Sequence, residues 1–229
     1  MAYELAVVKN HLLIAMTDGL ALLDTGSPQS YGAGGSMQLG VKTHGLSPDS
    51  FGVLDLVREQ VHPDIRYFLG HETLKDYRTL VDWPGGKVTF SAEPIALDGA
   101  GVLPMELVMD VPRIPIEFNG ARTTAILDSG AALSYAPDEA VENLQVVRTV
   151  TDFFPGVGDF ETGVRDVEVG FPHRRLCLQA GTLPQILALT LGMICSGWIL
   201  GADFFRDRRV VLDYPGAQVL DADGARVMR

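Results

Sequence analysis

The segments ALLDTGSPQSY, residues 21–31, and AILDSGAALSY, residues 125–135, show the same sequence pattern at two places in the chain. Both share Ala, Leu, Asp, Gly, Ser and Tyr at the same relative positions, and their aspartates, Asp24 and Asp128, are 104 positions apart. Such agreement in a chain without low-complexity sequence indicates an internal duplication. The duplication predicts two similar units, each with an aspartate directly after a short apolar strand.

A second pair of segments extends the repeat. Residues 68–89 and 199–220 align at an offset of 131 positions, and each runs from an apolar pair and a glycine to an Asp-aromatic-Pro-Gly turn. Because the two offsets differ by 27 residues, the second unit has an insertion of that length between its motifs. We therefore predict an N-terminal lobe, residues 1–97, and a larger C-terminal lobe, residues 98–229, joined in the turn-rich segment 91–101.

The composition is that of a globular protein with a substantial core. Of the 229 residues, 47% are hydrophobic and 21% are charged, and the net charge is −11. Nucleic acid is a poor partner for such a chain, because its binding depends mainly on Lys and Arg that neutralise phosphates. The five histidines, at positions 11, 44, 62, 71 and 173, lack the spacing of metal ligands, so we expect neither a metal nor another cofactor.

The N-terminus has no basic start followed by an apolar stretch and a cleavage site, so we expect a cytoplasmic protein. The longest apolar stretch, residues 186–200, is shorter than the roughly 20 residues of a membrane span, and we interpret it as a buried core segment. In a cytoplasm Cys177 and Cys195 would stay reduced, whereas export would allow a disulfide between them.

Short strands dominate the secondary structure that the sequence predicts. Helices are expected over residues 136–144, where a proline and acidic residues suit a helix start, and over two shorter segments, 71–77 and 202–208. The expected class is therefore mainly β with few short helices. Strands are predicted by β-branched residues between turn formers in residues 3–9, 11–16, 86–92, 115–120, 123–128, 208–214 and 217–224.

The doubled Asp-hydroxyl-Gly pattern also predicts a chemistry. If the two units pack around a pseudo-two-fold axis, Asp24 and Asp128 meet, and two adjacent carboxylates cannot both ionise comfortably. The pair then shares a proton and titrates as a unit. The ionised member can take a proton from a water molecule while the other donates one to a carbonyl oxygen, which is general acid–base hydrolysis of a peptide bond.

These motifs resemble those of the aspartic peptidases, in both the pepsin and the retropepsin branch. Residues 22–27 and 125–144 resemble the two catalytic loops, and residues 68–70 and 198–201 resemble the apolar-Gly segments beside them. The resemblance covers roughly half of the chain directly. It implies a two-lobed acid-protease (pepsin-like) fold with an active site between the lobes and an extended peptide or protein as substrate.

The resemblance also assigns roles to residues. Asp24 and Asp128 would form the catalytic pair, and Thr25 and Ser129 would hold the two loops together through hydroxyl-to-backbone hydrogen bonds. The remaining supporting residues are the two glycines, whose amides would face the carboxylates, and a serine that would donate to the outer oxygen of Asp24: Gly26, Gly130 and Ser27.

The second loop departs from this pattern, because Ala131 stands where Ser27 stands in the first. One carboxylate therefore loses a hydrogen bond that favours its charged form, and its pKa should rise. We expect a rate maximum milder than that of gastric pepsin, at about pH 4 to 6.

A second departure concerns the hairpin flap that pepsin-like enzymes close over their substrate. Only 46 positions separate Asp24 from Gly70, which leaves little room for a full flap. Two candidates for the flap remain. The first is Tyr31 as the flap tyrosine, although Tyr31 matches Tyr135 in the repeat, which disfavours this role. The second is a hairpin within residues 39–47. A shortened flap would leave the cleft open and weaken the exclusion of water.

Two functions fit these expectations. The first is an endopeptidase that cuts between apolar residues, since strands lining a cleft offer apolar pockets to alternate side chains. The second is a catalytically weak or inactive homologue that binds peptides as a scaffold. Two pseudo-symmetric lobes in one chain are compatible with a monomer.

Overall fold

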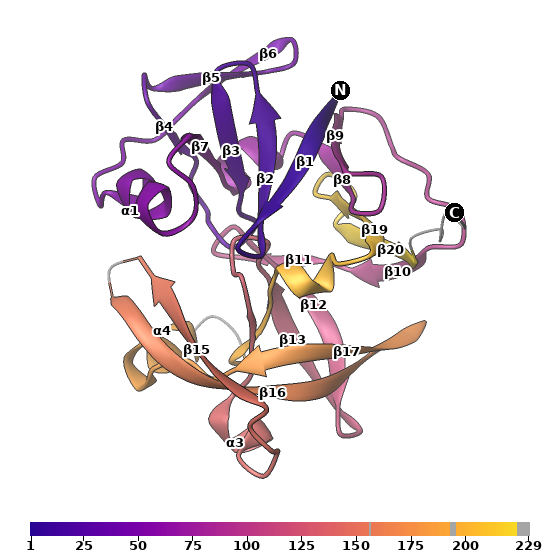
Figure 1. Ribbon diagram of the computed structural model, residues 1–229. Helices are drawn as coiled ribbons and strands as arrows, with labels where there is room; N and C mark the ends of the chain where they lie inside the picture. Colours follow the sequence, from indigo (N-terminus) through magenta and orange to yellow (C-terminus); the bar gives the residue numbers. More distant parts are fainter. Residues whose placement is uncertain (156, 193–195, 224–229) are drawn as a thin grey trace.

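A computed structural model describes residues 1–155, 157–192 and 196–223, and it consists of two lobes, one above the other in Figure 1. Most of the described chain is strand, arranged in sheets of ten, eight and two strands. The mainly β, two-lobed architecture expected from the duplication is confirmed.

The ten-stranded sheet forms the first lobe and continues beneath it. Its strand order is β10-β20-β19-β8-β9-β1-β2-β3-β7-β4. The strands are β1 (Ala2–Val8), β2 (His11–Met16), β3 (Gly19–Leu23), β4 (Tyr31–Gly32), β7 (Ile65–Leu69), β8 (Arg78–Asp82), β9 (Lys87–Ser91), β10 (Gly101–Pro104), β19 (Arg208–Asp213) and β20 (Gln218–Asp223).

The eight-stranded sheet forms the second lobe, in the order β11-β12-β13-β18-β14-β17-β16-β15. The extra length of the second unit lies mainly in its long strands and in helix α4. The strands are β11 (Glu106–Val108), β12 (Val111–Phe118), β13 (Ala121–Leu127), β14 (Ser134–Tyr135), β15 (Arg148–Phe154), β16 (Gly158–Phe171), β17 (Arg174–Gly181) and β18 (Trp198–Leu200).

The two-stranded sheet and the helices are short. Each strand expected from the sequence is present, and each expected helix forms over fewer residues than expected. These elements are β5 (Ser36–Leu39), β6 (Lys42–Gly45), α1 (Val53–Gln60), α2 (His71–Leu74), α3 (Asp138–Val141), α4 (Gln185–Gly192) and the 3-10 helix η1 (Ala202–Phe204).

Helix α1 was not expected from the sequence. Its start is fixed by Asp49, whose two carboxylate oxygens accept hydrogen bonds from the amides of Val53 and Leu54, each at 2.8 Å. A carboxylate there satisfies amides that have no partner within the helix and suits the positive end of the helix dipole. Val57, one turn later, is buried with the first two residues, so one face of the helix packs on the lobe.

The interpretation of residues 186–200 as one buried segment is wrong for its first part. Ile186 and Leu189 on α4 each expose 65% of their surface, whereas all of β18 is buried. Cys177 is exposed and free, and Cys195 lies outside the described residues, so their pairing stays untested. Within the described part of the chain, we find no helix of the length and apolar character that crossing a bilayer requires.

The two lobes share hydrogen bonds through the ten-stranded sheet. β19 pairs antiparallel with β8, with Leu80 opposite Val211, and β20 then pairs with β10. The last strands of the chain therefore lie in one sheet with strands of residues 1–97, beneath the first lobe in Figure 1. A lobe boundary at residues 97–98 stays a prediction.

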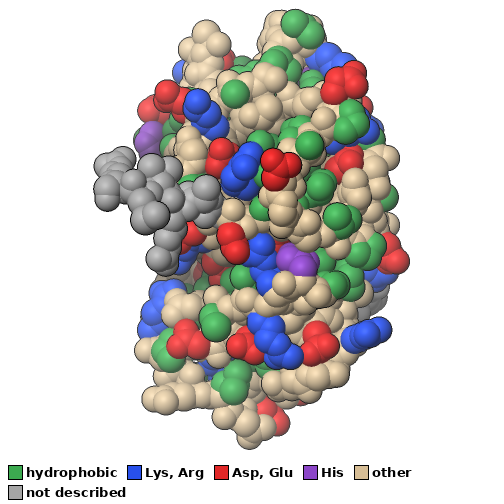
Figure 2. All heavy atoms as spheres, turned by 90° about the vertical axis from the view of Figure 1, so that its right-hand side faces the viewer, with side chains coloured by type: hydrophobic (Ala, Val, Ile, Leu, Met, Phe, Trp, Pro, Cys, Tyr) green, Lys and Arg blue, Asp and Glu red, His purple; other side chains and the backbone are tan. Residues whose placement is uncertain are grey.

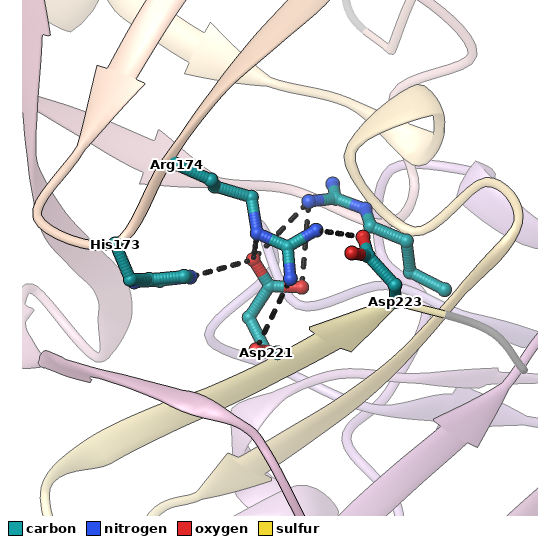
Figure 3. Close-up of polar contacts among 5 residues, drawn as sticks. His173, Arg174, Asp221 and Asp223 are labelled. Carbon is teal, nitrogen blue, oxygen red and sulfur yellow. Dashed lines mark hydrogen bonds and ion pairs between the residues drawn. The ribbon is translucent and has the colours of Figure 1, made fainter.

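A buried cluster of charges fastens the second lobe to this shared sheet (Figure 3). Asp221 on β20 is fully buried, and Arg208 on β19 lies 3.2 Å from its Oδ2. His173 and Arg174, at the turn between β16 and β17, point toward the same carboxylate, with nitrogen–oxygen distances of 3.3 Å. One buried anion thus joins groups from both parts of the fold.

The face of the molecule drawn in Figure 2 is mixed in charge. Figure 2 shows the right-hand side of the molecule in Figure 1, where acidic and basic side chains are interspersed among apolar ones. The net charge of −11 is therefore not gathered into one acidic area on this face.

Replacing Asp221 by Ala should lower the free energy of unfolding by about 3 to 5 kcal/mol, because it leaves the buried Arg208 without its partner. Urea unfolding at neutral pH measures the change. The matched control is Asp223→Ala, which removes an exposed partner of Arg174 and should cost less than about 1 kcal/mol. Equal costs for the two variants would contradict this assignment.

Candidate active site

Each predicted aspartate directly follows a strand whose last three residues are buried. β3 runs parallel to β7, and the amide of Asp24 donates to the carbonyl oxygen of Leu69 at 2.9 Å. In the second lobe β13 runs parallel to β18, and the amide of Asp128 donates to Leu200 at the same distance. The two units of the sequence repeat therefore place their aspartates by the same backbone pairing.

The glycine that follows each apolar segment lies against the loop after the aspartate. A Cβ at Gly70 would lie 2.1 Å from the carbonyl oxygen of Gln29, and a Cβ at Gly201 would lie 2.6 Å from that of Leu133. Only glycine permits such close backbone approach. Pairing of the apolar-Gly segments with the aspartate loops, as the resemblance implied, is present in both lobes.

Two buried hydroxyl groups join the first aspartate loop, residues 24–27, to the second, residues 128–131. Thr25 Oγ1 donates to the carbonyl oxygen of Leu127 at 2.6 Å and accepts from the amide of Ser129 at 2.9 Å. Ser129 Oγ donates to the carbonyl oxygen of Leu23 at 2.8 Å and accepts from the amide of Thr25 at 3.1 Å. These four crossed hydrogen bonds fix the two loops against each other across the lobes.

The crossed bonds bring each carboxylate against the other loop's glycine. A Cβ at Gly26 would lie 2.2 Å from Cγ of Asp128, and a Cβ at Gly130 would lie 2.1 Å from Oδ2 of Asp24. The structure thus brings Asp24 and Asp128 together, with the two glycines packed crosswise against them. Any side chain at either glycine would push the two carboxylates apart.

Burial raises the pKa of both carboxyl groups, but not equally. The pKa of Asp24 lies well above its ordinary value, because burial and then the adjacent Asp128 anion both disfavour its charge. The pKa of Asp128 is raised by burial and held back by hydrogen bonds from the amides of Gly130 and Ala131, at 2.9 and 3.2 Å. Asp24 is therefore the member that holds the proton, and Asp128 is the member that ionises first.

Ser27 does not have the predicted contact. Its hydroxyl has a single proton, which it donates to the carbonyl oxygen of Gln29 at 2.9 Å, so it does not donate to Asp24. The backbone amides of Gly26 and Ser27 act on Asp24 instead and partly oppose the rise of its pKa. The loop after Asp24 turns toward Gln29 at this point, which directs the serine side chain away from the carboxylate.

The two aspartates line a cavity of about 240 Å³. Its other walls are mainly apolar and come from both lobes, which is typical of a pocket for an apolar ligand group. Sequence reasoning missed several of these residues, among them a histidine, a helix face and a strand end of the second lobe: His11, Val53, Val57, Phe153 and Phe154.

Neither sequence-based flap candidate covers the cavity. The hairpin β5–β6 forms, but its buried His44 bonds Tyr77 at 2.7 Å and its turn contacts Tyr3, so it packs on the far side of the first lobe. Among the described residues that line the cavity, none belongs to this hairpin. Tyr31 does line the cavity, but from strand β4 within the sheet, where its hydroxyl donates to Gln29.

Replacing Gly26 or Gly130 by Ala should lower any activity of this site at least about 100-fold, because displacing a reacting group by even 1 Å can cost that much. Steady-state kinetics of the purified variants measures the loss. The control is Gly45→Ala on β6, where, among the described residues, an added Cβ meets nothing within 4 Å. Full activity in the Gly26 variant would contradict the crosswise packing.

Replacing Asp24 by Asn should make the protein increasingly more stable than the wild type as the pH rises from 4 to 7. A carboxyl group whose pKa is raised in the folded state costs stability once the pH exceeds its unfolded value of about 3.9, whereas an amide does not titrate. Urea unfolding of both proteins across this range measures the difference. A difference that stays constant or shrinks with pH would show that the pKa of Asp24 is not raised.

The comparison with solved structures bears on the fold, and no protein-family model and no curated protein matches the sequence. An aspartic proteinase from Irpex lacteus superposes over 100% of this chain and 98% of its own, with a TM-score of 0.50 and 13% identity. A retropepsin-like aspartic protease from Rickettsia conorii covers 54% of this chain and 89% of its own, with a TM-score of 0.37 and 13% identity. The simian foamy virus (mac) protease covers 40% and 88%, with a TM-score of 0.31 and 16% identity. By the match to the Irpex lacteus structure over its whole length, the chain has the fold of the aspartic peptidases.

Proposed function

We propose that the protein is an aspartic endopeptidase that hydrolyses peptide bonds with the pair Asp24 and Asp128. The observation that carries this proposal is the pair of adjacent, buried carboxyl groups with raised pKa values, which line a mainly apolar cavity. In addition, no described residue donates a hydrogen bond to the buried Oδ1 of Asp24. A buried acceptor without a partner is costly, so this oxygen favours a site that is completed by a ligand.

The difference between the two carboxyl groups assigns their roles. Asp128, the member that ionises first, is the general base that takes a proton from the attacking water molecule. Asp24, the member that keeps its proton, is the general acid that donates to the carbonyl oxygen of the scissile bond. When the tetrahedral intermediate collapses, Asp128 donates the proton that it took from water to the leaving amine nitrogen, and Asp24 takes a proton from a hydroxyl group of the intermediate. The pair then again holds its single proton on Asp24, and the cycle needs no covalent intermediate.

The supporting residues of the aspartate loops hold this arrangement rather than take part in the proton transfer. Thr25 and Ser129 lock the loops through their crossed bonds, and Gly26 and Gly130 allow the two carboxyl groups to approach. Preorganised groups of this kind lower the barrier because little reorganisation is left for the reaction step.

The substrate that this cavity favours is an extended peptide with apolar residues around the scissile bond. Leu22, Phe68 and Ile199 line the cavity beside the aspartates and offer apolar surface to a substrate side chain. Transfer of an apolar side chain out of water into such a pocket supplies binding energy without a specific polar partner.

Incubation with a mixed peptide library from pH 3 to 8, followed by mass spectrometry, tests this function. We expect cleavage between apolar residues, reduced at least about 100-fold by Asp24→Asn and by Asp128→Asn. Activity should fall as the pH rises through the pKa of Asp24 and as it drops through that of Asp128, with the maximum at about pH 4 to 6. The control is Asp82→Asn, which changes a turn aspartate outside the cavity.

A folded wild type that cleaves nothing in this range would contradict the proposal. The protein would then be a peptide-binding scaffold that has the fold without the activity. A maximum below about pH 3 would contradict the assignment of raised pKa values to the pair.

A further inference from the structure

The second lobe extends a hairpin toward the first. β15 and β16 pair antiparallel from Arg148 opposite Val164 to Phe154 opposite Gly158. In Figure 1 this hairpin rises from the second lobe toward helix α1 of the first lobe. Phe153, Phe154 and the following Pro155 line the same cavity as the two aspartates.

The base of this hairpin is tied to the second aspartate loop. Tyr135 lies on β14, just after that loop, and its hydroxyl donates to Oδ2 of Asp152 on β15. The ring of Tyr135 also packs on Phe160 of β16, with centroids 6.2 Å apart. Val150 and Phe160 both pack against the buried apolar cluster of the second lobe that includes Tyr135. The position of the hairpin is therefore coupled to that of Asp128.

The end of the hairpin contacts the first lobe. Phe153 packs against an apolar cluster of the first lobe that includes Leu22, Val53 and Val57. Its ring also meets the ring of His11 on β2 edge-on, with centroids 6.0 Å apart. His11 is buried, and its Nδ1 has no hydrogen-bond partner among the described residues. The hairpin thus bridges the lobes over the cavity and leaves one buried polar atom at its edge.

The hairpin β5–β6 of the first lobe contributes none of the described residues that line the cavity, because it packs on the far side of that lobe. We propose that Phe153 and Phe154 form the wall of a specificity subsite that receives a bulky apolar side chain of the peptide, and that the β15–β16 hairpin of the second lobe covers the aspartate pair. This inference rests on the proposed function only in that the ligand is a peptide.

The apolar character of the wall formed by Phe153 and Phe154 determines which side chain of the peptide is preferred. Phe153 and Phe154 on one side and the aliphatic residues Val53 and Val57 of α1 on the other make this part of the cavity mainly apolar. Aromatic faces and edges prefer other aromatic or aliphatic groups and discriminate against small ones, which leave part of the pocket unfilled. We expect Phe or Leu to be preferred over Ala at the residues that flank the scissile bond.

The test measures binding, so it does not depend on turnover. Two peptides with a reduced, uncleavable central bond, flanked by Phe in one and by Ala in the other, are titrated calorimetrically into the wild type and into Phe153→Ala. We expect the variant to lose at least about 10-fold in affinity for the Phe peptide and less than about threefold for the Ala peptide. Thr149→Ala, an exposed position on the same strand outside the cavity, should bind like the wild type.

A second measurement separates a specificity role from a merely structural one. A peptide with naphthylalanine in place of Phe should bind Phe153→Ala better than the Phe peptide does, because the larger ring fills the space that the truncation opens. Phe154→Ala should give the same shift in preference if both rings form the wall. Urea unfolding verifies that the variants are folded.

Equal losses for the Phe and Ala peptides, or no loss for either, would overturn the subsite. Binding of neither peptide by the wild type would overturn it as well. If Phe153→Ala loses affinity for the Phe peptide but not for the Ala peptide, and the wild type cleaves no peptide in the library, the proposed subsite is supported and the proposed hydrolysis is contradicted.

Discussion

The relative position of the two lobes depends on four crossed hydrogen bonds at the centre of the molecule. Thr25 and Ser129 are fully buried, and each hydroxyl both donates to a carbonyl and accepts from an amide of the other lobe's loop. Buried polar groups must find partners, and among the described residues the partners of these two hydroxyl groups lie in the other lobe. The two halves of the duplication are thereby held in one relative position, and Asp24 and Asp128 are placed side by side as a consequence.

The remaining features follow from that constraint. Two carboxyl groups in a buried, shared site raise each other's cost of ionisation, so one proton stays with the pair. The glycines at positions 26 and 130 supply the space for this approach, and the charge cluster around Asp221 holds the second lobe on the shared sheet. The apolar walls of the cavity keep the dielectric low around the pair, which strengthens every electrostatic interaction within it.

The sequence predicted the parts of this arrangement that repeat, and missed those that do not. Asp24, Asp128 and their neighbouring hydroxyl and glycine residues were found because both copies of the pattern show them at the same offset. Helix α1 was missed because its start depends on Asp49, which lies outside the periodic segment. The contact of Phe153 with His11 joins positions far apart in sequence, and no local pattern encodes it. The apolar run 153–155 before a glycine, within the insertion of the second unit, was the one available signal for the covering hairpin.

The central claim is that Asp24 and Asp128 share one proton in a buried pair, and a carboxyl ¹³C NMR titration of selectively labelled aspartate tests it most directly. The signal of Asp24, assigned by its loss in Asp24→Asn, should remain that of a protonated acid well above the ordinary aspartate pKa of about 3.9, and its titration should change when Asp128 is replaced by Asn. Independent ionisation of both aspartates near that ordinary value would contradict the account.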